Sequence, residues 1–246
     1  MFDHVTIRVT SRRESERFYE TVLRTLGIEP THSGDHFAEW DDFSLAEAGA
    51  ESPVTRRLHI GFAAPTRAHV DAFWRTGVAA GCASDGEPGP RPQYSDDYYG
   101  AFLLDPDGNS VEAVHHGSLR DGGNVDHLWI RVSDVDAATA FYETVGPAAG
   151  FRVGSELGDR TLFACVSGSF SVVAGAEPSE NVHLAFAAAD DDTVERFHRD
   201  ATAAGYRDNG APGERPVYHA GYYAAFVLDP DGNNVEVVNH NRAEPT

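Results

Sequence analysis

The chain has 246 residues and a formal net charge of −20 at neutral pH. That length allows two ordinary domains, each with its own core. The negative charge disfavours nucleic acid and anionic membranes as partners, because both are polyanions. No apolar run has the length that crossing a bilayer requires, and the N-terminus starts directly on a strand pattern, so we expect a cytoplasmic protein.

One sequence unit occurs twice in the chain. Residues 98–115 read YYGAFLLDPDGNSVEAVH and residues 222–239 read YYAAFVLDPDGNNVEVVN, with thirteen of eighteen positions identical. The openings match as well: DHVTIRV starts at Asp3 and DHLWIRV starts at Asp126. A repeat this long indicates a duplicated domain, since solenoid repeats are much shorter. We predict a first domain at 1–116, a glycine-rich linker at 117–124 and a second domain at 125–246.

The hydrophobic pattern predicts an α+β fold in which each unit divides again. The first unit reads strand, helix, strand, strand, and then restarts; the expected strands are 3–10, 37–40, 43–48, 57–63, 99–104 and 109–114, and the helices are 11–26 and 66–80. In the second unit we expect helices near 135–145 and 192–204. The whole chain is then four successive βαβββ modules, which form two tandem half-barrel domains. Cys82 and Cys165 fall at non-equivalent places, so a reducing compartment is expected rather than a disulfide.

Alternation along the strands separates an apolar face from a face that carries histidines and glutamates. Side chains two residues apart on a strand share a face. His4 therefore points to the other face from Val5, and Glu112 points to the other face from Val111 and Ala113. The apolar faces should pack on the helices, which leaves the other faces to line a cavity. Each unit thus offers two histidines and one glutamate on three strands: His4, His59 and Glu112, and then His127, His183 and Glu236.

Two neutral imidazoles and one carboxylate are a ligand set for a divalent transition metal with open positions for water or substrate. The spacing supports one design, because 53 residues separate histidine and glutamate in both His59–Glu112 and His183–Glu236. The alternative is that these are ordinary half-buried strand residues. The repeat of the whole triad favours a metal, although the sequence leaves open whether each triad closes within one unit or is shared between them.

These motifs resemble the vicinal oxygen chelate superfamily, which holds glyoxalase I, extradiol dioxygenases, and fosfomycin- and bleomycin-resistance proteins. The resemblance rests on DHVTIRV with FYETVL, on LHIGF and VHLAF, and on the two LDPDGN–VE ends. It implies paired βαβββ modules that curl around a divalent metal ion, such as Fe, Mn, Ni or Zn. It also implies that the ligands are the six residues found above.

The resemblance does not select one reaction. Extradiol dioxygenases carry a histidine and a tyrosine before the terminal glutamate; His219 matches the first of these, but Phe226 replaces the tyrosine. Glyoxalase I adds a fourth ligand, which Glu47 could supply in the first unit, whereas Ala174 stands at that place in the second. Bleomycin-resistance binders generally lack the metal triad.

Other polar residues have a functional and an ordinary interpretation. Arg8 and Arg131 share the face of the first ligand of each unit and could clamp a substrate carboxylate or phosphate, or else reach solvent at a strand end. Tyr99 and Tyr223, with their neighbouring tyrosines, could line the cavity mouth or pack in the core. His219 is a candidate general acid or base, or a polar loop residue.

We therefore expect a metal-dependent enzyme, a lyase, isomerase or oxygenase, acting on a small oxygen-bearing substrate, anionic substrates included. The alternatives are a non-catalytic protein that binds a small molecule or antibiotic, and a chain with one catalytic and one structural domain. The expected partner is a small molecule. The chain would be a monomer of two paired domains or a homodimer.

Overall fold

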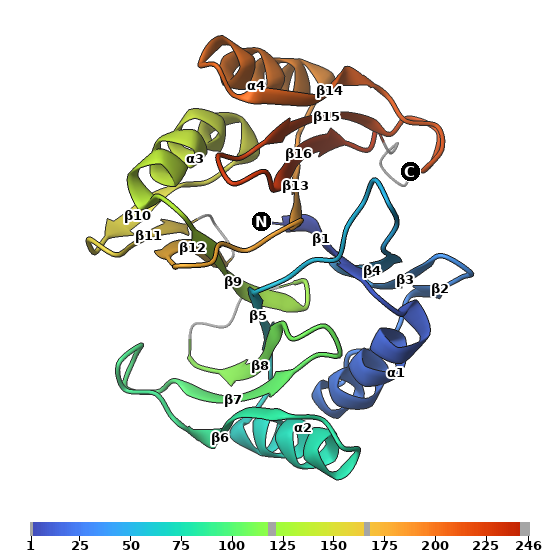
Figure 1. The fold of residues 1–246 in the computed structure, drawn as a ribbon, viewed down its shortest axis with the longest axis vertical. Coiled ribbons are helices and arrows are strands. Elements are labelled where there is room, and N and C mark those ends of the chain that lie inside the picture. Colours follow the sequence, from blue (N-terminus) through green and yellow to red (C-terminus); the bar gives the residue numbers. More distant parts are fainter. Residues whose placement is uncertain (1, 118–121, 165–167, 242–246) are drawn as a thin grey trace.

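The computed structural model describes residues 2–117, 122–164 and 168–241, and these ranges form the four expected βαβββ modules (Figure 1). Module 1 consists of β1 (Phe2–Val9), α1 (Arg12–Leu23) with a 3₁₀ turn at Arg24–Leu26, β2 (His32–Ser33), β3 (Phe37–Trp40) and β4 (Phe43–Glu47). Module 2 consists of β5 (Leu58–Ala63), α2 (Arg67–Ala79), β6 (Ser84–Pro90), β7 (Tyr99–Leu104) and β8 (Ser110–His115). Cys82 has a free thiol, whereas Cys165 and residues 118–121 of the expected linker lie outside the described residues.

The second unit repeats this order. Module 3 consists of β9 (Val125–Val132), α3 (Val135–Ala149), β10 (Arg152–Glu156), β11 (Arg160–Ala164) and β12 (Ser169–Ala174). Module 4 consists of β13 (His183–Ala187), α4 (Asp191–Ala203), β14 (Arg207–Glu214), β15 (Tyr223–Leu228) and β16 (Asn234–Asn239). None of the helices in the described ranges has both the length and the apolar character needed to cross a membrane.

The strands form two eight-stranded mixed sheets, and each sheet takes one module from each sequence unit. One sheet has the order β14-β15-β16-β13-β1-β4-β3-β2 and so joins modules 4 and 1. The other has the order β10-β11-β12-β9-β5-β8-β7-β6 and joins modules 3 and 2. Antiparallel pairs β1–β13 and β5–β9 make the two junctions. The sheets therefore do not follow the predicted domain boundaries, which stay a prediction from the repeat.

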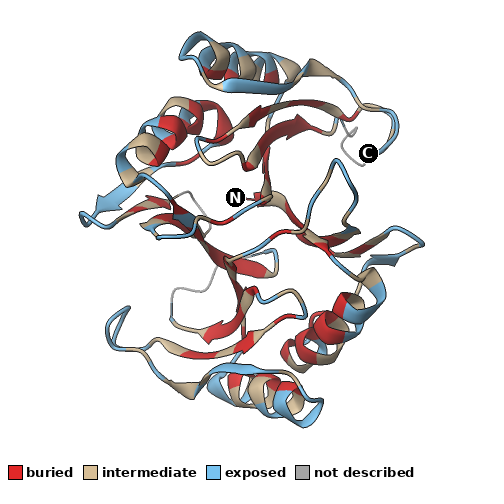
Figure 2. Cartoon of the chain, viewed as in Figure 1, coloured by how far each residue is buried: buried red, intermediate tan, exposed pale blue. Residues whose placement is uncertain are grey.

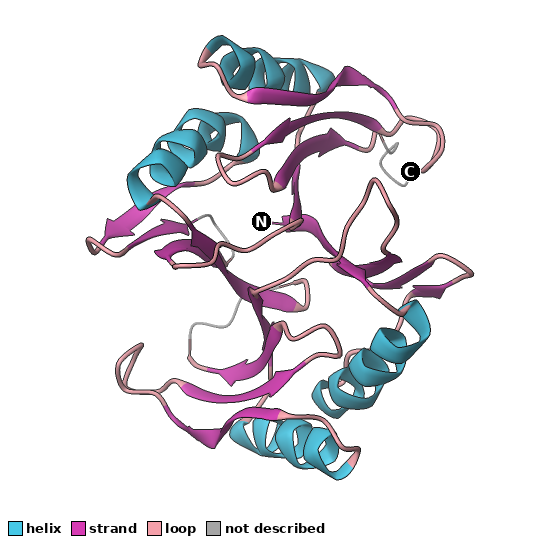
Figure 3. Ribbon diagram, viewed as in Figure 1, coloured by secondary structure: helices cyan, strands magenta, loops and turns pink. Residues whose placement is uncertain are grey.

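The helices, by contrast, pair within units. Helix α1 packs against α2, and α3 packs against α4, at the outer edges of the molecule (Figure 3). Most buried apolar side chains of the four modules belong to one continuous core between helices and sheets (Figure 2), and a small separate cluster in module 4 holds Ala185, Tyr222, Ala224 and Val238. The helix–helix contacts thus fall within each sequence unit, whereas the strand pairing in each sheet connects the two units.

Three differences from the sequence-based elements have physical causes. Strands β6 and β14 went unpredicted because SDGEPGP and RDNGAPGE are rich in glycine and proline. Both lie at a sheet edge, where proline costs no ladder hydrogen bond. Helix α3 continues past the expected end at Val145, through Pro147, to a left-handed cap at Gly150 with φ 77°.

Candidate metal centres

The structure brings the six predicted ligands into two clusters, each built from both sequence units. We call His59, Glu112 and His127 the first site, and His4, His183 and Glu236 the second site. The ligand atoms of each cluster all lie within 4.8 Å of one another. In both sites the histidine of the first strand comes from the other unit, because β9 pairs with β5 and β1 pairs with β13. The open alternative of a shared triad is therefore the arrangement that the structure adopts.

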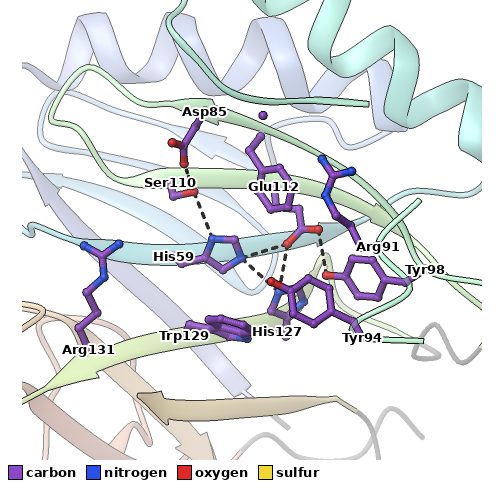
Figure 4. A pocket seen from close by; sticks show the side chains of 12 residues that line it. His59, Asp85, Arg91, Tyr94, Tyr98, Ser110, Glu112, His127, Trp129 and Arg131 are labelled. Atoms are coloured by element: carbon purple, nitrogen blue, oxygen red, sulfur yellow. Dashed lines mark hydrogen bonds and ion pairs between the residues drawn. The ribbon is translucent and has the colours of Figure 1, made fainter. Parts of the chain in front are cut away.

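In the first site three ligand atoms face one point (Figure 4). The His59 Nε2 atom lies 3.0 Å from Glu112 Oε2 and 3.2 Å from His127 Nε2, and His127 Nε2 lies 3.3 Å from Glu112 Oε2. Metal bonds of 2.0–2.2 Å at tetrahedral or octahedral angles place ligand atoms about 2.9–3.5 Å apart. These three distances fit a single divalent ion.

Each remaining polar atom of the first-site ligands has a protein partner. The Nδ1–H of His127 donates to Asp126 (2.9 Å), the Nδ1–H of His59 donates to Ser110 (3.2 Å), and Tyr98 O–H donates to Glu112 Oε1 (2.9 Å). Such partners fix the imidazole tautomer and leave Nε2 as the coordinating atom. The donor set is therefore oriented as a metal site requires.

The charges in the first site stabilise one another. Burial opposes ionisation of Glu112, but its polar contacts with His127 and His59 outweigh burial and lower the pKa of Glu112 to about 2. Burial likewise disfavours a charged His127, yet Asp126 and Glu112 raise the pKa of this imidazole to about 10. Burial and Glu112 raise the pKa of Tyr98 well above its usual value, so its hydroxyl stays a donor. The two shifts have one cause, which is the mutual attraction of the Glu112 carboxylate and the His127 imidazolium.

The second site has the same plan with a looser geometry. His183 Nε2 lies 2.8 Å from Glu236 Oε2, but His4 Nε2 lies 3.6 Å from that atom. Tyr222 O–H donates to Glu236 Oε1 (2.6 Å), and the Nδ1–H of His4 donates to Asp3 (2.8 Å). The His4 side chain is 22% exposed, against 10% for His127 in the first site.

One residue difference explains the looser site. In the β5–β9 ladder, Gly61 lies opposite His127, and a Cβ atom at Gly61 would stand 2.4 Å from the imidazole. In the β1–β13 ladder the equivalent residue is Ala185, opposite His4. At the second site the methyl group of Ala185 stands where the first site has free space beside Gly61. His4 therefore stays farther from Glu236 than His127 does from Glu112.

Each predicted acidic or basic residue near the sites has a definite place. Glu47 is exposed and pairs with Val9, five residues beyond His4, or about 16 Å along the strand. It does not join a ligand cluster. Arg131 lines a cavity beside the first site. Arg8 lies on β1 four residues beyond His4, opposite Ala46 on β4.

The two tyrosines of each pair face opposite sides of the sheet, and substrate contacts by Tyr99 and Tyr223 stay a prediction. Tyr99 O–H donates to Asp71 on α2, and Tyr223 O–H donates to Glu195 on α4, so both face the helices. Tyr98 and Tyr222 face the sites instead, because adjacent residues of an extended chain point to opposite sides. The alternation that located Glu112 would have located Tyr98 as well.

His219 lies at the rim of the second site and reaches His4 only through other residues. Its ring lies 2.8 Å from His240, which lies 2.8 Å from Asp3, the partner of His4. In the first site His116 contacts Asp126, the partner of His127, as His240 contacts Asp3 in the second site. In the sequence, the Asp-His dipeptide at the start of each unit indicates these two carboxylates, Asp3 and Asp126, because each precedes the histidine that it holds.

Two cavities adjoin the first site. A cavity of about 340 Å³ includes His59, Glu112, Arg131 and the aromatic residues Tyr94, Tyr98, Phe102 and Trp129. A second cavity of about 460 Å³ shares Tyr94, Tyr98, His127 and Trp129 with it and extends to Arg160 on β11. The ligand cluster is therefore accessible to a small molecule.

The fold resembles that of several solved structures. Glyoxalase I from Zea mays superposes with a TM-score of 0.71 at 16% identity, over 97% of this chain and 92% of that chain. A candidate dioxygenase from Bacillus subtilis superposes with a TM-score of 0.67 at 14% identity, over 98% of this chain and 86% of that chain. No curated protein is similar enough in sequence to match.

The sequence matches a family model twice. Residues 1–113 and 124–237 match the Glyoxalase/Bleomycin resistance protein/Dioxygenase superfamily, so the chain belongs to this superfamily. The resemblance inferred from the motifs and the expected α+β fold of tandem modules are both confirmed.

Proposed function

We propose that the protein is a divalent-metal-dependent enzyme that acts on a small, oxygen-bearing substrate. The observation that carries the proposal is the first site, where three ligand atoms lie 3.0–3.3 Å apart beside an open cavity. When bound there, Fe²⁺, Mn²⁺, Ni²⁺ or Zn²⁺ would act as a Lewis acid on neighbouring substrate oxygens and stabilise developing oxyanion charge. That chemistry suits a lyase, an isomerase or an oxygenase.

The protein groups around the first site would orient the substrate. Tyr98 and Asp126 hold the ligands, so neither is free to bind substrate. Arg131 lines the cavity and offers a charged donor for a substrate carboxylate or phosphate. In the second site, Phe226 lies edge-on to His183 at 6.3 Å between ring centroids, where the sequence pattern of ring-cleaving dioxygenases has a tyrosine. The missing hydroxyl favours chemistry other than ring cleavage.

Metal analysis of protein purified without chelator tests the proposal. We expect two equivalents of divalent metal in the unaltered chain and one equivalent in each of the variants His59→Ala and His183→Ala. Turnover of substrates with adjacent oxygens should require the metal. Protein that is metal-free and takes up none of the four ions on titration would refute the proposal. Metal-bound protein that binds such compounds without converting them would favour the binding alternative.

A further inference from the structure

The walls of the two sites differ at equivalent positions. Trp129 lies two residues beyond the ligand His127 on β9 and pairs with Ser171 on β12. The same ladder position in the second site holds Thr6, paired with Ser44 on β4, and these two hydroxyls hydrogen-bond to each other at 2.7 Å. A flat apolar surface therefore faces the first site, and a small polar pair stands in its place at the second.

The next strand outward carries a second difference. On β11, Arg160 pairs with Val173 and Leu162 pairs with Ser171. The equivalent residues on β3 are Phe37 and Glu39, which pair with Ala46 and Ser44. The first site thus has a cation at its outer wall, whereas the second has a carboxylate.

Arg160 and Trp129 form one surface. The guanidinium carbon of Arg160 lies 5.7 Å from the centre of the Trp129 ring. No carboxylate of the described residues forms an ion pair with Arg160, so its donors are available to a ligand. The Tyr94 and Trp129 rings are perpendicular, at 86° with their centroids 5.5 Å apart, and both line the cavity that includes the metal ligands.

We propose that the first site selects a substrate in which a flat apolar group adjoins an anionic group, read by Trp129 and Arg160, and that the second site lacks this selectivity. The inference rests on the proposed metal-dependent function. A flat group gains contact area and favourable ring geometry on Trp129. A carboxylate or phosphate gains a bidentate, charge-assisted hydrogen bond from Arg160. The two sites are then not redundant copies.

Hydroxamates test this directly, because they present two adjacent oxygens to a metal and can carry different groups. The His183→Ala variant keeps only the first site and the His59→Ala variant keeps only the second; both are loaded with Mn²⁺ or Co²⁺. Calorimetry then compares acetohydroxamate, benzohydroxamate, and the carboxy and aminomethyl derivatives of benzohydroxamate. Both the 3- and the 4-substituted isomers are used.

At the first site we expect benzohydroxamate to bind about tenfold more tightly than acetohydroxamate, and the better carboxy isomer about tenfold more tightly than its aminomethyl analogue. Trp129→Thr should remove the first preference, and Arg160→Phe should remove the second; both install the residue of the other site. Arg152→Met, at an exposed position on β10, is the matched control and should change neither. Metal stoichiometry and circular dichroism establish that each variant is folded.

Equal preferences at the two sites would overturn the inference. A carboxylate preference that survives Arg160→Phe but disappears in Arg131→Leu would overturn it too, since Arg131 has a counterpart in Arg8. If no metal binds, the proposed function fails by itself. Benzoate and benzylamine binding to the metal-free protein then decides the inference separately: a benzoate preference that depends on Arg160 supports it, and no preference contradicts it.

Discussion

The first and second sites have the same ligands, and they differ in how tightly the ligands are held. Both use a histidine and a glutamate from one unit and a histidine from the other. At the first site Gly61 lets His127 approach to 3.3 Å from Glu112, while at the second site Ala185 keeps His4 at 3.6 Å from Glu236. The comparison teaches that duplication preserved the coordination plan and that small residues beside the ligands set its quality.

The largest expected effect on metal affinity comes from the first-strand histidines, His4 and His127, because each completes the site of the other unit. In the His183→Ala background only the first site remains, so adding His127→Ala should abolish metal binding, with an affinity loss above about 100-fold. Adding His4→Ala to that background should leave the affinity unchanged, although His4 belongs to the same sequence unit as His59. Isothermal titration with Mn²⁺ measures both. The reverse result would show that each triad closes within its own unit.

The glycine difference gives the next effect. Gly61→Ala places a methyl group 2.4 Å from the His127 ring, so the ring must move away from its ligand position. Overpacking of this kind costs about 1–3 kcal/mol, and the metal affinity of the first site should fall by roughly ten- to a hundredfold. Ala185→Gly is the converse change and should tighten the second site. An unaltered affinity in both variants would remove steric spacing as the cause of the difference.

Metal binding at the first site should depend on pH. The raised pKa of His127, about 10, means that a metal ion must displace a proton at neutral pH. The apparent affinity should therefore rise about tenfold per pH unit between pH 6.5 and 8.5 in the His183→Ala variant. The stability of the metal-free protein should change with pH in the opposite direction. The raised folded-state pKa of His127 contributes fully to the free energy of unfolding below about pH 6.5, and this contribution is lost as the pH rises toward 10. An affinity that is flat over this range would contradict the assignment of the proton to His127.

The smallest effect concerns the support of the second histidine in each site. His59 donates to Ser110, whose hydroxyl donates to Asp85 (2.7 Å). In the second unit Asn234 takes the place of Ser110 and accepts a hydrogen bond from Asn209, which takes the place of Asp85 (2.9 Å). Ser110→Ala should lower the metal affinity of the first site a few-fold, up to about tenfold, by freeing the His59 ring. Asn234→Ala should leave the second site unchanged, and titration of the two single-site variants compares them.

Much of the site could be predicted from sequence, because strand alternation has a period of two and needs no tertiary information. It placed His59 and Glu112 on the face away from the helices, and both lie there. The same rule, applied to the tyrosine pair, would have chosen Tyr98 over Tyr99. Edge strands such as β6 were not predicted, because their glycine and proline residues do not give the alternating strand pattern. An edge strand accepts these residues since one of its sides needs no ladder hydrogen bonds.

The sequence by itself determined the four modules, the superfamily and the six side chains that face away from the helices. Only the tertiary structure decided which three of them meet. All four modules have the same order of elements, so the strand that opens module 1 could pair equally well with that of module 2 or module 4 by its pattern alone. The chain pairs β1 with β13 and β5 with β9, and backbone register across those junctions, which no local pattern records, brings His4 to Glu236 and His127 to Glu112.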